Sequence, residues 1–326
     1  MRSSASFARD SNLDMAIRLL VLVGPTTSGK TRLGVEVAHR LDSEIISADS
    51  RQVYRGLDIG SGKDLNEYRE VTPPVPYHLI DVADPREVYS VFHYQRDCYR
   101  LLEEKECDPS FGGGRPLVMV GGTGLLVEAV LRGYRIPNVP EDETLRRRLM
   151  RKKHAELVQE LRSADARLFL RTDCSSKKRV VRALEIANEA RQHPVRYSPP
   201  PPVRIDHAVF VIDVPPDELR RRIDIRLEQR LEQGMIAEVE RLLAAGVPEA
   251  RMAQLGLEYR EVTAYLSGTK SEQDMLDDLR RGIRKFAKRQ RTWFRGLSRR
   301  GLEVSWIGPE DHDALLRHPW STSSPS

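Results

Sequence analysis

The chain has little cysteine and no long apolar run. Its three cysteines, Cys98, Cys107 and Cys174, are spaced as neither a disulfide framework nor a zinc site requires, so we expect a reducing, cytoplasmic location. A membrane helix needs about 18–20 apolar residues. The longest apolar run, residues 17–23, is far shorter and contains Arg18. We therefore expect neither a disulfide-rich secreted domain nor a membrane protein.

The composition is that of a folded chain with a small basic excess. Of the 326 residues, 40% are hydrophobic, which is enough to form a buried core. The length predicts two domains, or one large domain with an insertion. The 53 Lys and Arg residues outnumber the 48 Asp and Glu residues by five, so only the placement of the basic residues can indicate a partner.

Short apolar runs alternate with helical patterns along most of the chain. We expect buried strands at residues 18–23, 44–47, 116–120 and 208–214, an edge strand at 303–307, and a helix at 30–41. This alternation predicts an α/β fold with a parallel sheet flanked by helices, and a ligand at the carboxyl ends of the strands. Residues 1–16 are predicted to be a disordered tail and residues 309–326 a flexible one.

The α/β pattern is interrupted once. Residues 137–202 lack strand signals and are helical and basic, and they end in the stiff run Pro199–Pro202. We interpret them as an all-helical insertion with a proline-rich exit, placed between residues 17–136 and 203–308 of one α/β catalytic domain.

A phosphate-binding loop follows the first predicted strand and opens the first helix. The sequence G-x-x-x-x-G-K-[ST] is matched at every defined position by the run Gly24, Pro25, Thr26, Thr27, Ser28, Gly29, Lys30 and Thr31. Backbone N–H groups and the helix dipole bind phosphate oxygens, Lys30 adds a charge, and the Thr31 hydroxyl is a ligand for Mg²⁺. The pattern predicts a polyphosphate site but leaves nucleotide or ATP binding, phosphoryl transfer and reaction of a diphosphate ester all open.

A second group of polar residues follows the second predicted strand. Asp49 lies at its carboxyl end, on the same edge of the sheet as the phosphate loop. From that position its carboxylate is suited to hold Mg²⁺ or to act as a general base. An aspartate there is also common as a helix cap or turn residue, so the motif alone does not decide.

Six motifs together resemble those of the tRNA dimethylallyltransferase family, and the resemblance implies a P-loop NTPase-like fold. They are GPTTSGKT at 24–31, ISADSRQVYRGLDIGSGK at 46–63, HLID at 78–81, LVMVGGTG at 117–124, RALEI at 182–186 and AKRQRTWFR at 287–295. The resemblance implies transfer of a dimethylallyl group from dimethylallyl diphosphate to N6 of the adenine 3′-adjacent to the anticodon. One departure is the segment Gly256–Arg260, where many members have a shorter Gly-Tyr-Arg element.

The resemblance also implies residue roles. Asp49 matches the general base, Lys30 and Thr31 match the residues that handle diphosphate and Mg²⁺, and Arg226 matches an arginine that binds diphosphate. Contacts with tRNA are implied for Asp49, Ser50, Arg51, Gln52, Thr123, Lys178, Arg179 and Arg182.

Basic residues gather in two places. Residues 279–300 contain ten and no acidic residue, and Arg281, Arg284, Lys285 and Lys288 recur at helical spacing, which favours a bound polyanion. Arg284 and Lys288 are therefore further candidates for tRNA contact, whereas Trp293 and Phe294 are expected mainly to anchor this helix to the core. The second basic group belongs to the insertion, which the resemblance assigns to the anticodon stem-loop.

Three alternatives remain open from the sequence. The first is a prenyltransferase whose acceptor is free AMP or ADP. The second is a P-loop kinase, and the third is an RNA-binding module without catalysis. The basic segments disfavour a free nucleotide, and no strand ends in the aspartate of a Walker B motif. We expect a monomer.

Overall fold

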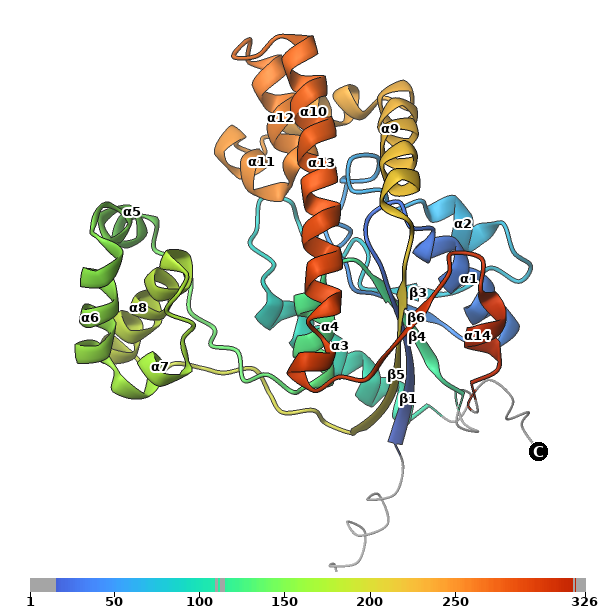
Figure 1. Ribbon diagram of the computed structural model, residues 1–326, viewed down its shortest axis with the longest axis horizontal. Coiled ribbons are helices and arrows are strands. Elements are labelled where there is room, and N and C mark those ends of the chain that lie inside the picture. The colour runs from blue at the N-terminus through green and yellow to red at the C-terminus, as the bar shows by residue number, and fades with distance from the viewer. Residues whose placement is uncertain (1–15, 109–110, 112–114, 319, 321–326) are drawn as a thin grey trace, which may run out of the picture. The chain divides into compact units, whose positions relative to one another are not determined.

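The computed structural model describes residues 16–108, 111, 115–318 and 320 (Figure 1). They form two compact units, one made of the chain up to Gly133 together with the chain from Pro201 onward, the other of Tyr134–Pro200. We call these the α/β unit and the helical unit. The predicted insertion was 137–202, so the observed limits lie two or three residues from the expected ones.

The α/β unit contains a six-stranded parallel sheet, which confirms the predicted fold class. Its order is β3-β2-β4-β1-β5-β6. The strands are β1 (Ala16–Val23), β2 (Ile45–Ser47), β3 (Tyr77–His78), β4 (Leu117–Gly121), β5 (Arg204–Ile212) and β6 (Val304–Ile307). Five were expected within a few residues, including β6 at the edge. The two-residue β3 was missed because it is too short to show a period.

Helices cover both faces of the sheet. One group contains α1 (Lys30–Arg40), α2 (Leu65–Arg69) and α14 (His312–Leu316), and the opposite group contains α3 (Val91–Glu106), α4 (Gly124–Leu131) and α13 (Glu272–Arg295) (Figure 1). The chain between β5 and α13 forms α9 (Pro216–Glu232), α10 (Met235–Ala244), α11 (Glu249–Leu255) and α12 (Leu257–Leu266). A short 3₁₀ helix at Ser298–Arg300 leads into β6.

Helix α13 is long because its sequence alternates apolar and basic residues at helical spacing. Ser271 caps its first turn by accepting a hydrogen bond from the N–H of Asp274. Its buried residues recur every three or four positions: Met275, Leu279, Ile283, Ala287, Gln290 and Phe294. This stripe packs on α9, α12 and α4, which leaves the basic residues on the other side of the helix.

Both predicted tails need correction. Ala16 belongs to β1 and pairs with Arg204, while residues 1–15 lie outside the described part of the chain. The segment from 309 onward was expected to be flexible, but α14 folds against α1 and Leu315 is buried. The polar residues around Leu315 obscured this single apolar anchor in the sequence.

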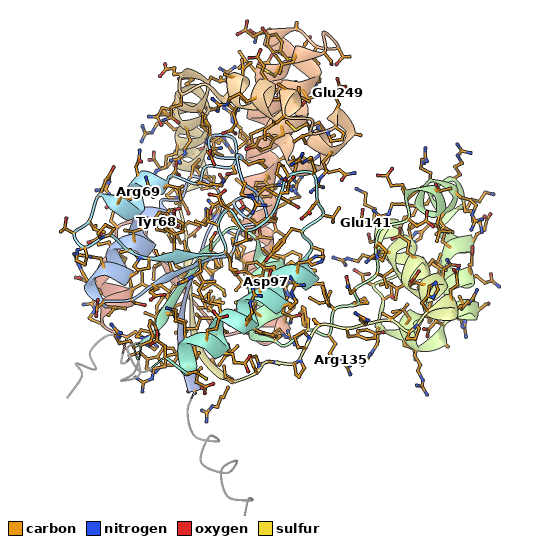
Figure 2. All side chains as sticks on the ribbon, turned by 180° about the vertical axis from the view of Figure 1, so that it is seen from behind. Tyr68, Arg69, Asp97, Arg135, Glu141 and Glu249 are labelled. Atoms are coloured by element: carbon orange, nitrogen blue, oxygen red, sulfur yellow. The ribbon has the colours of Figure 1, made fainter. Side chains whose placement is uncertain are left out.

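The helical unit has a small core of its own. It consists of α5 (Glu143–Arg151), α6 (His154–Ala164), α7 (Ala166–Arg171) and α8 (Lys177–Gln192). Asp142 and Asp165 cap α5 and α7 through their side chains. The core residues are Leu145, Leu149, Leu157, Leu161, Val180, Val181, Ala183 and Leu184. Glu141, labelled in Figure 2, pairs with Arg146 beside the start of α5.

Substitution of leucines in this unit tests whether its core stabilises it. Leu157 is fully buried and Leu170 is 82% exposed. We expect Leu157→Ala to lower the free energy of unfolding of the helical unit by about 2–5 kcal/mol, because it leaves a cavity. Leu170→Ala should change it by less than about 0.5 kcal/mol. Hydrogen exchange of α6 and α8 in the full-length protein measures both, and equal effects would contradict the assigned core.

Candidate functional site

Three loops meet at the carboxyl edge of the sheet because the parallel strands end in register. Val23 pairs with Gly121, and Ser47 pairs with Val120. The phosphate loop, the Asp49 loop and the turn after β4 therefore begin side by side. Gly121 permits this approach, since a Cβ atom there would collide with the carbonyl oxygen of Ala48.

The phosphate loop runs from β1 into α1 as its sequence predicts. Gly29 has φ of 85°, a left-handed conformation that favours glycine, and α1 starts at the next residue. The hydroxyl of Ser28 is buried and lacks a hydrogen-bond partner among the described residues. Ser28 does not line the cavity at this edge, so its side chain packs inside the loop beside Gly24 and the backbone N–H groups are the candidates for binding phosphate.

Lys30 and Asp49 approach each other across Gly122. A Cβ atom on Gly122 would lie 3.6 Å from Cε of Lys30 and 3.7 Å from Oδ2 of Asp49. Desolvation lowers the pKa of the Lys30 ammonium, and the charge of Asp49 partly offsets this effect. An anion in the same space would favour the charged lysine further.

The backbone holds Asp49 in a fixed orientation. Its Oδ1 accepts a hydrogen bond of 2.9 Å from the N–H of Arg51, which leaves Oδ2 toward the cavity floor at Gly122. The next residue, Ser50, donates its N–H to the hydroxyl of Thr123 at 3.1 Å. Ser50 and Thr123, both expected at the site, thus join the loops after β2 and β4.

Arg51 and Gln52 already have partners within the protein. Arg51 donates to the carbonyl oxygen of Gln254 at 3.1 Å. Gln52 is buried, accepts from the Ser47 hydroxyl and donates to the Gly62 carbonyl, each at 2.9 Å. A contact between the Gln52 amide and RNA would require these bonds to break, so its observed role is to support the loop.

Arg226 reaches the same site from α9. It forms an ion pair with Asp64, which immediately precedes α2. Glu67 on α2 also lines the site, and its Oε2 is buried without a hydrogen-bond partner among the described residues. Burial, followed by repulsion from Asp64, raises the pKa of Glu67 to about 7. Of the two residues that follow Glu67, both labelled in Figure 2, Tyr68 is buried and Arg69 is exposed.

The loop before α2 is fixed by two buried charged groups. The Glu238 carboxylate accepts hydrogen bonds from the N–H groups of three successive residues, 58–60, at 2.7–3.0 Å, and from the Tyr259 hydroxyl at 2.9 Å. Lys63 is 1% exposed and pairs with Asp58 and Asp81 at 2.6 and 2.5 Å. These bonds give the site a rigid wall.

A cavity of about 770 Å³ is lined by Lys30, Asp49, Arg226 and Glu67. At one end it is lined by the phosphate loop and Arg226, and elsewhere by Asp49, Thr123 and residues of α12 and α13. Gln290 of α13 links the phosphate loop to the turn after β4. Its Oε1 accepts from the Thr26 N–H at 2.9 Å and its Nε2 donates to the Gly122 carbonyl at 2.8 Å. The predicted Trp293 lines this cavity, whereas Phe294 is fully buried in the core as expected.

The residues present suit a metal that takes most of its ligands from a substrate. No group of three or more His, Cys, Asp or Glu side chains capable of holding a metal occurs in the described parts of the chain. The Thr31 hydroxyl lines the cavity beside Lys30. One hydroxyl combined with phosphate oxygens is a ligand set that Mg²⁺ accepts.

The basic face of α13 is partly neutralised, which the sequence did not reveal. Arg281 pairs with Asp278 and Arg284 with Asp224, at 2.6 and 2.5 Å. The charge repulsion expected along this face is therefore smaller than predicted. For the exposed Lys285 and Lys288 no ion pair is found among the described residues.

In the helical unit, too, some basic residues are paired with acidic ones and others are not. Arg179 pairs with Asp173, and Arg182 donates to the Val139 carbonyl at 2.6 Å and approaches Glu185 at 3.3 Å. Lys178 is exposed. Of the predicted RNA-contacting residues in this unit, Lys178 is the one whose charge has no described partner.

Several residues of the site were missed from the sequence. Gln290, Asp64, Glu67, Arg230 and Glu258 all line the cavity. Gln290 lies within the quoted motif AKRQRTWFR and Glu258 within the departing segment, so a signal existed for these two. Asp64, Glu67 and Arg230 look like solvated helix residues until the fold brings them together.

Two family profiles match the sequence. The one described as IPP transferase matches residues 52–297, and the one described as isopentenyl transferase matches residues 16–75. Among curated relatives, tRNA dimethylallyltransferase 1 of Syntrophus aciditrophicus is 45% identical over 92% of this chain and 97% of the relative. Its namesake in Geotalea uraniireducens is 46% identical over 90% of this chain and 93% of the relative.

Solved structures give the same family. A tRNA isopentenylpyrophosphate transferase from Bacillus halodurans is similar with a TM-score of 0.64 and 32% identity, covering 92% of this chain and 93% of the other. A eukaryotic dimethylallyltransferase acting on tRNA has the same fold, with a TM-score of 0.64 and 20% identity, covering 93% and 77%.

The raised pKa of Glu67 predicts a pH effect on stability. An unfolded glutamate has a pKa of about 4.3, so between pH 5 and 7 the folded chain holds more protons at this position than the unfolded chain. Rising pH therefore reduces the free energy of unfolding through this residue. Glu67→Gln removes the effect, so we expect the variant to gain stability relative to the wild type between pH 5 and pH 8.

Urea denaturation at the two pH values, without Mg²⁺ or phosphate, measures this difference. Glu103→Gln, at an exposed position of α3, is the matched control and should show no such gain. A Glu67→Gln difference that does not change with pH would contradict the prediction.

Proposed function

Because the chain belongs to the IPP transferase family, we propose that it transfers the dimethylallyl group of dimethylallyl diphosphate to N6 of the adenine 3′-adjacent to the anticodon of tRNA. The observation that carries this proposal is one cavity in which a phosphate loop faces a fixed aspartate, lined on one side by a helix rich in arginine and lysine.

The diphosphate of the allyl donor binds at the phosphate loop. Backbone N–H groups of the phosphate loop and of the first turn of α1 donate hydrogen bonds to its oxygens, with Lys30 and Arg226 as cationic partners. The polar residues of this end suit the diphosphate, while Leu257, Ile283, Phe286 and Trp293 supply apolar surface for the allyl group. This arrangement orients the donor along the cavity.

Mg²⁺ would be held by Thr31 together with diphosphate oxygens. When bound, it stabilises negative charge on the leaving diphosphate as a Lewis acid. The protein supplies the remainder of this stabilisation through Lys30 and Arg226, which are preorganised around the same oxygens.

Asp49 serves the acceptor. The allylic C–O bond breaks with its electron pair on the diphosphate, the N6 nitrogen forms the new C–N bond, and Asp49 takes the N6 proton. The adenine amine is a weak nucleophile because its lone pair is delocalised into the ring. The allyl carbon must therefore become strongly electrophilic as the C–O bond breaks. The cations at the phosphate end assist this step because they stabilise the negative charge of the leaving diphosphate.

The tRNA binds along the basic surfaces. Lys285 and Lys288 of α13 have exposed ammonium groups, and Arg284 remains 42% exposed beside Asp224. Lys178, Arg179 and Arg182 of the helical unit provide a second set for the anticodon stem-loop. The adenine must leave the base stack to enter a cavity of this depth, as in other base-modifying enzymes.

The proposal includes a cytoplasmic monomer. All three cysteines are free, and none of the helices in the described residues is long and apolar enough to cross a bilayer. Both observations agree with access to tRNA in a reducing compartment.

Substitution of Asp49 tests the chemistry. Asp49→Asn keeps the shape but removes the proton acceptor, so we expect the rate of transfer from labelled dimethylallyl diphosphate to an anticodon stem-loop RNA to fall about 10²- to 10⁴-fold. Single-turnover assays with Mg²⁺ measure this rate. Asp206→Asn, at the opposite end of the parallel sheet, should retain it.

The wild-type reaction has two informative comparisons. Chelation of Mg²⁺ should abolish transfer, and free AMP should be a far poorer acceptor than the stem-loop. Equal use of AMP would favour the free-nucleotide alternative, and no transfer to any RNA with an adenine at that position would refute the proposal.

The basic face of α13 predicts a salt effect. Lys288→Ala removes one phosphate contact, so we expect weaker stem-loop binding and a change of about one in the slope of log K against log salt concentration. Arg69→Ala, at an exposed position of α2, is the control. Binding isotherms at several salt concentrations measure the slope, and equal slopes for Lys288→Ala and the wild type would exclude this contact.

A further inference from the structure

We propose that Arg230 is a second arginine for the diphosphate of the allyl donor, and that Glu258 is a positioning residue that holds it until the anion binds. This inference rests on the proposed function and extends it to two residues for which the sequence alone predicts no role.

Arg230 lies one helical turn after Arg226 on α9, so the two side chains leave the same face of the helix. Both line the cavity. The Arg230 side chain is only 12% exposed, so its charge has been withdrawn from water into the cavity wall. Arginine remains charged in such surroundings and therefore needs an anionic partner.

The partners available within the described residues do not satisfy this guanidinium. Its Nη1 lies 3.7 Å from Oε1 of Glu258, beyond a normal hydrogen bond, and 3.4 Å from the Gly60 carbonyl oxygen. Its Nε is buried and has no partner. A guanidinium with five donors and these two long contacts has several donors left for a ligand.

The electrostatics of the pair favour an added anion. Burial lowers the pKa of Arg230 and raises the pKa of Glu258, so each group is less well stabilised than in water. A diphosphate oxygen would form shorter, charge-assisted hydrogen bonds with the arginine than the distant carboxylate does. Arg230 would then exchange Glu258 for the ligand without leaving the cavity.

The surrounding backbone is shaped for this side chain. Gly62 has φ of 64°, and any Cβ atom on it would collide with Nη2 of Arg230. The loop that carries Gly62 is fixed through Glu238 and Lys63, as described above. The space for the guanidinium is therefore built into a rigid wall.

Glu258 lies in the first turn of α12, within the segment Gly256–Arg260. The charges of Arg51 and Asp49, which line the same cavity, also act on the Glu258 carboxylate and shift its pKa. Asp64 is a further carboxylate whose charge acts on Arg230.

Titration with inorganic diphosphate in the presence of Mg²⁺ tests the inference. Arg230→Met keeps the length of the side chain and removes its charge. We expect it to weaken diphosphate binding roughly 10- to 100-fold, the loss typical of a charge-assisted hydrogen bond, while binding of the stem-loop RNA alone changes less than about twofold. Arg222→Met, one turn before Arg226 and paired with Glu218 at 2.8 Å, is the matched control and should bind diphosphate normally.

Glu258→Gln should change the affinity for diphosphate in the opposite direction. Removal of the competing carboxylate frees Arg230, so diphosphate should bind about threefold more tightly than to the wild type. A pair with a purely structural role would instead lower the thermal stability of both variants and leave the affinity for diphosphate unchanged.

The outcomes separate this inference from the proposed function. Unchanged diphosphate affinity of Arg230→Met, or a selective loss of RNA binding, overturns the role of Arg230 while transfer to tRNA by the wild type stands. Failure of the wild type to prenylate RNA, combined with the expected diphosphate titrations, refutes the proposed function and leaves the diphosphate site intact.

Discussion

The buried amide of Gln290 joins the parts on which the site depends. Its oxygen holds the phosphate loop at Thr26 and its nitrogen holds the turn after β4 at Gly122. Because Gln290 belongs to α13, the helix that carries the basic surface is locked to the two loops that form the cavity floor. An amide can do this because it offers a donor and an acceptor at once, whereas a charged side chain of the same length would leave one loop unpaired. Burial makes both bonds costly to lose.

The cavity contains charges of both signs, and three of its cations each have a carboxylate as counter-ion. Lys30 is balanced by Asp49, Arg226 by Asp64, and Arg230 by Glu258. Each cation thus has an internal counter-ion in the absence of a ligand, which limits the cost of burying it. A diphosphate would compete with these carboxylates, so its affinity is a difference between two sets of ion pairs. Carboxylates such as Glu67, with a pKa of about 7, can also reduce this competition by holding a proton.

Much of this arrangement could be predicted from the sequence, for reasons visible in particular residues. Strands β1 and β4 and the second half of β5 are largely buried and therefore appear as apolar runs. Residues 24–31 carry a motif whose spacing is set by the geometry of phosphate binding. Asp49 and Thr123 could be located because each directly follows such a strand. The helical unit could be recognised because its residues have no strand signal and end in prolines. Family resemblance, rather than spacing, assigned the reaction.

The rest depends on contacts between distant segments, which leave little local trace. Asp64 and Arg226 are separated by 162 positions, and Thr26 and Gln290 by 264. The acidic partner of Arg284, Asp224 of α9, likewise became visible only when the two helices were placed, whereas Asp278 lies only three residues before Arg281 on the same helix. A basic run in sequence therefore overstates the charge available to RNA, because the fold neutralises part of it. Exposed basic residues for which no ion pair is found among the described residues remain, among them Lys285, Lys288 and Lys178. Their flexible ammonium groups suit phosphate contacts that position an RNA without reading its bases. If the proposed function holds, discrimination between acceptors then depends on the cavity at the carboxyl edge of the sheet.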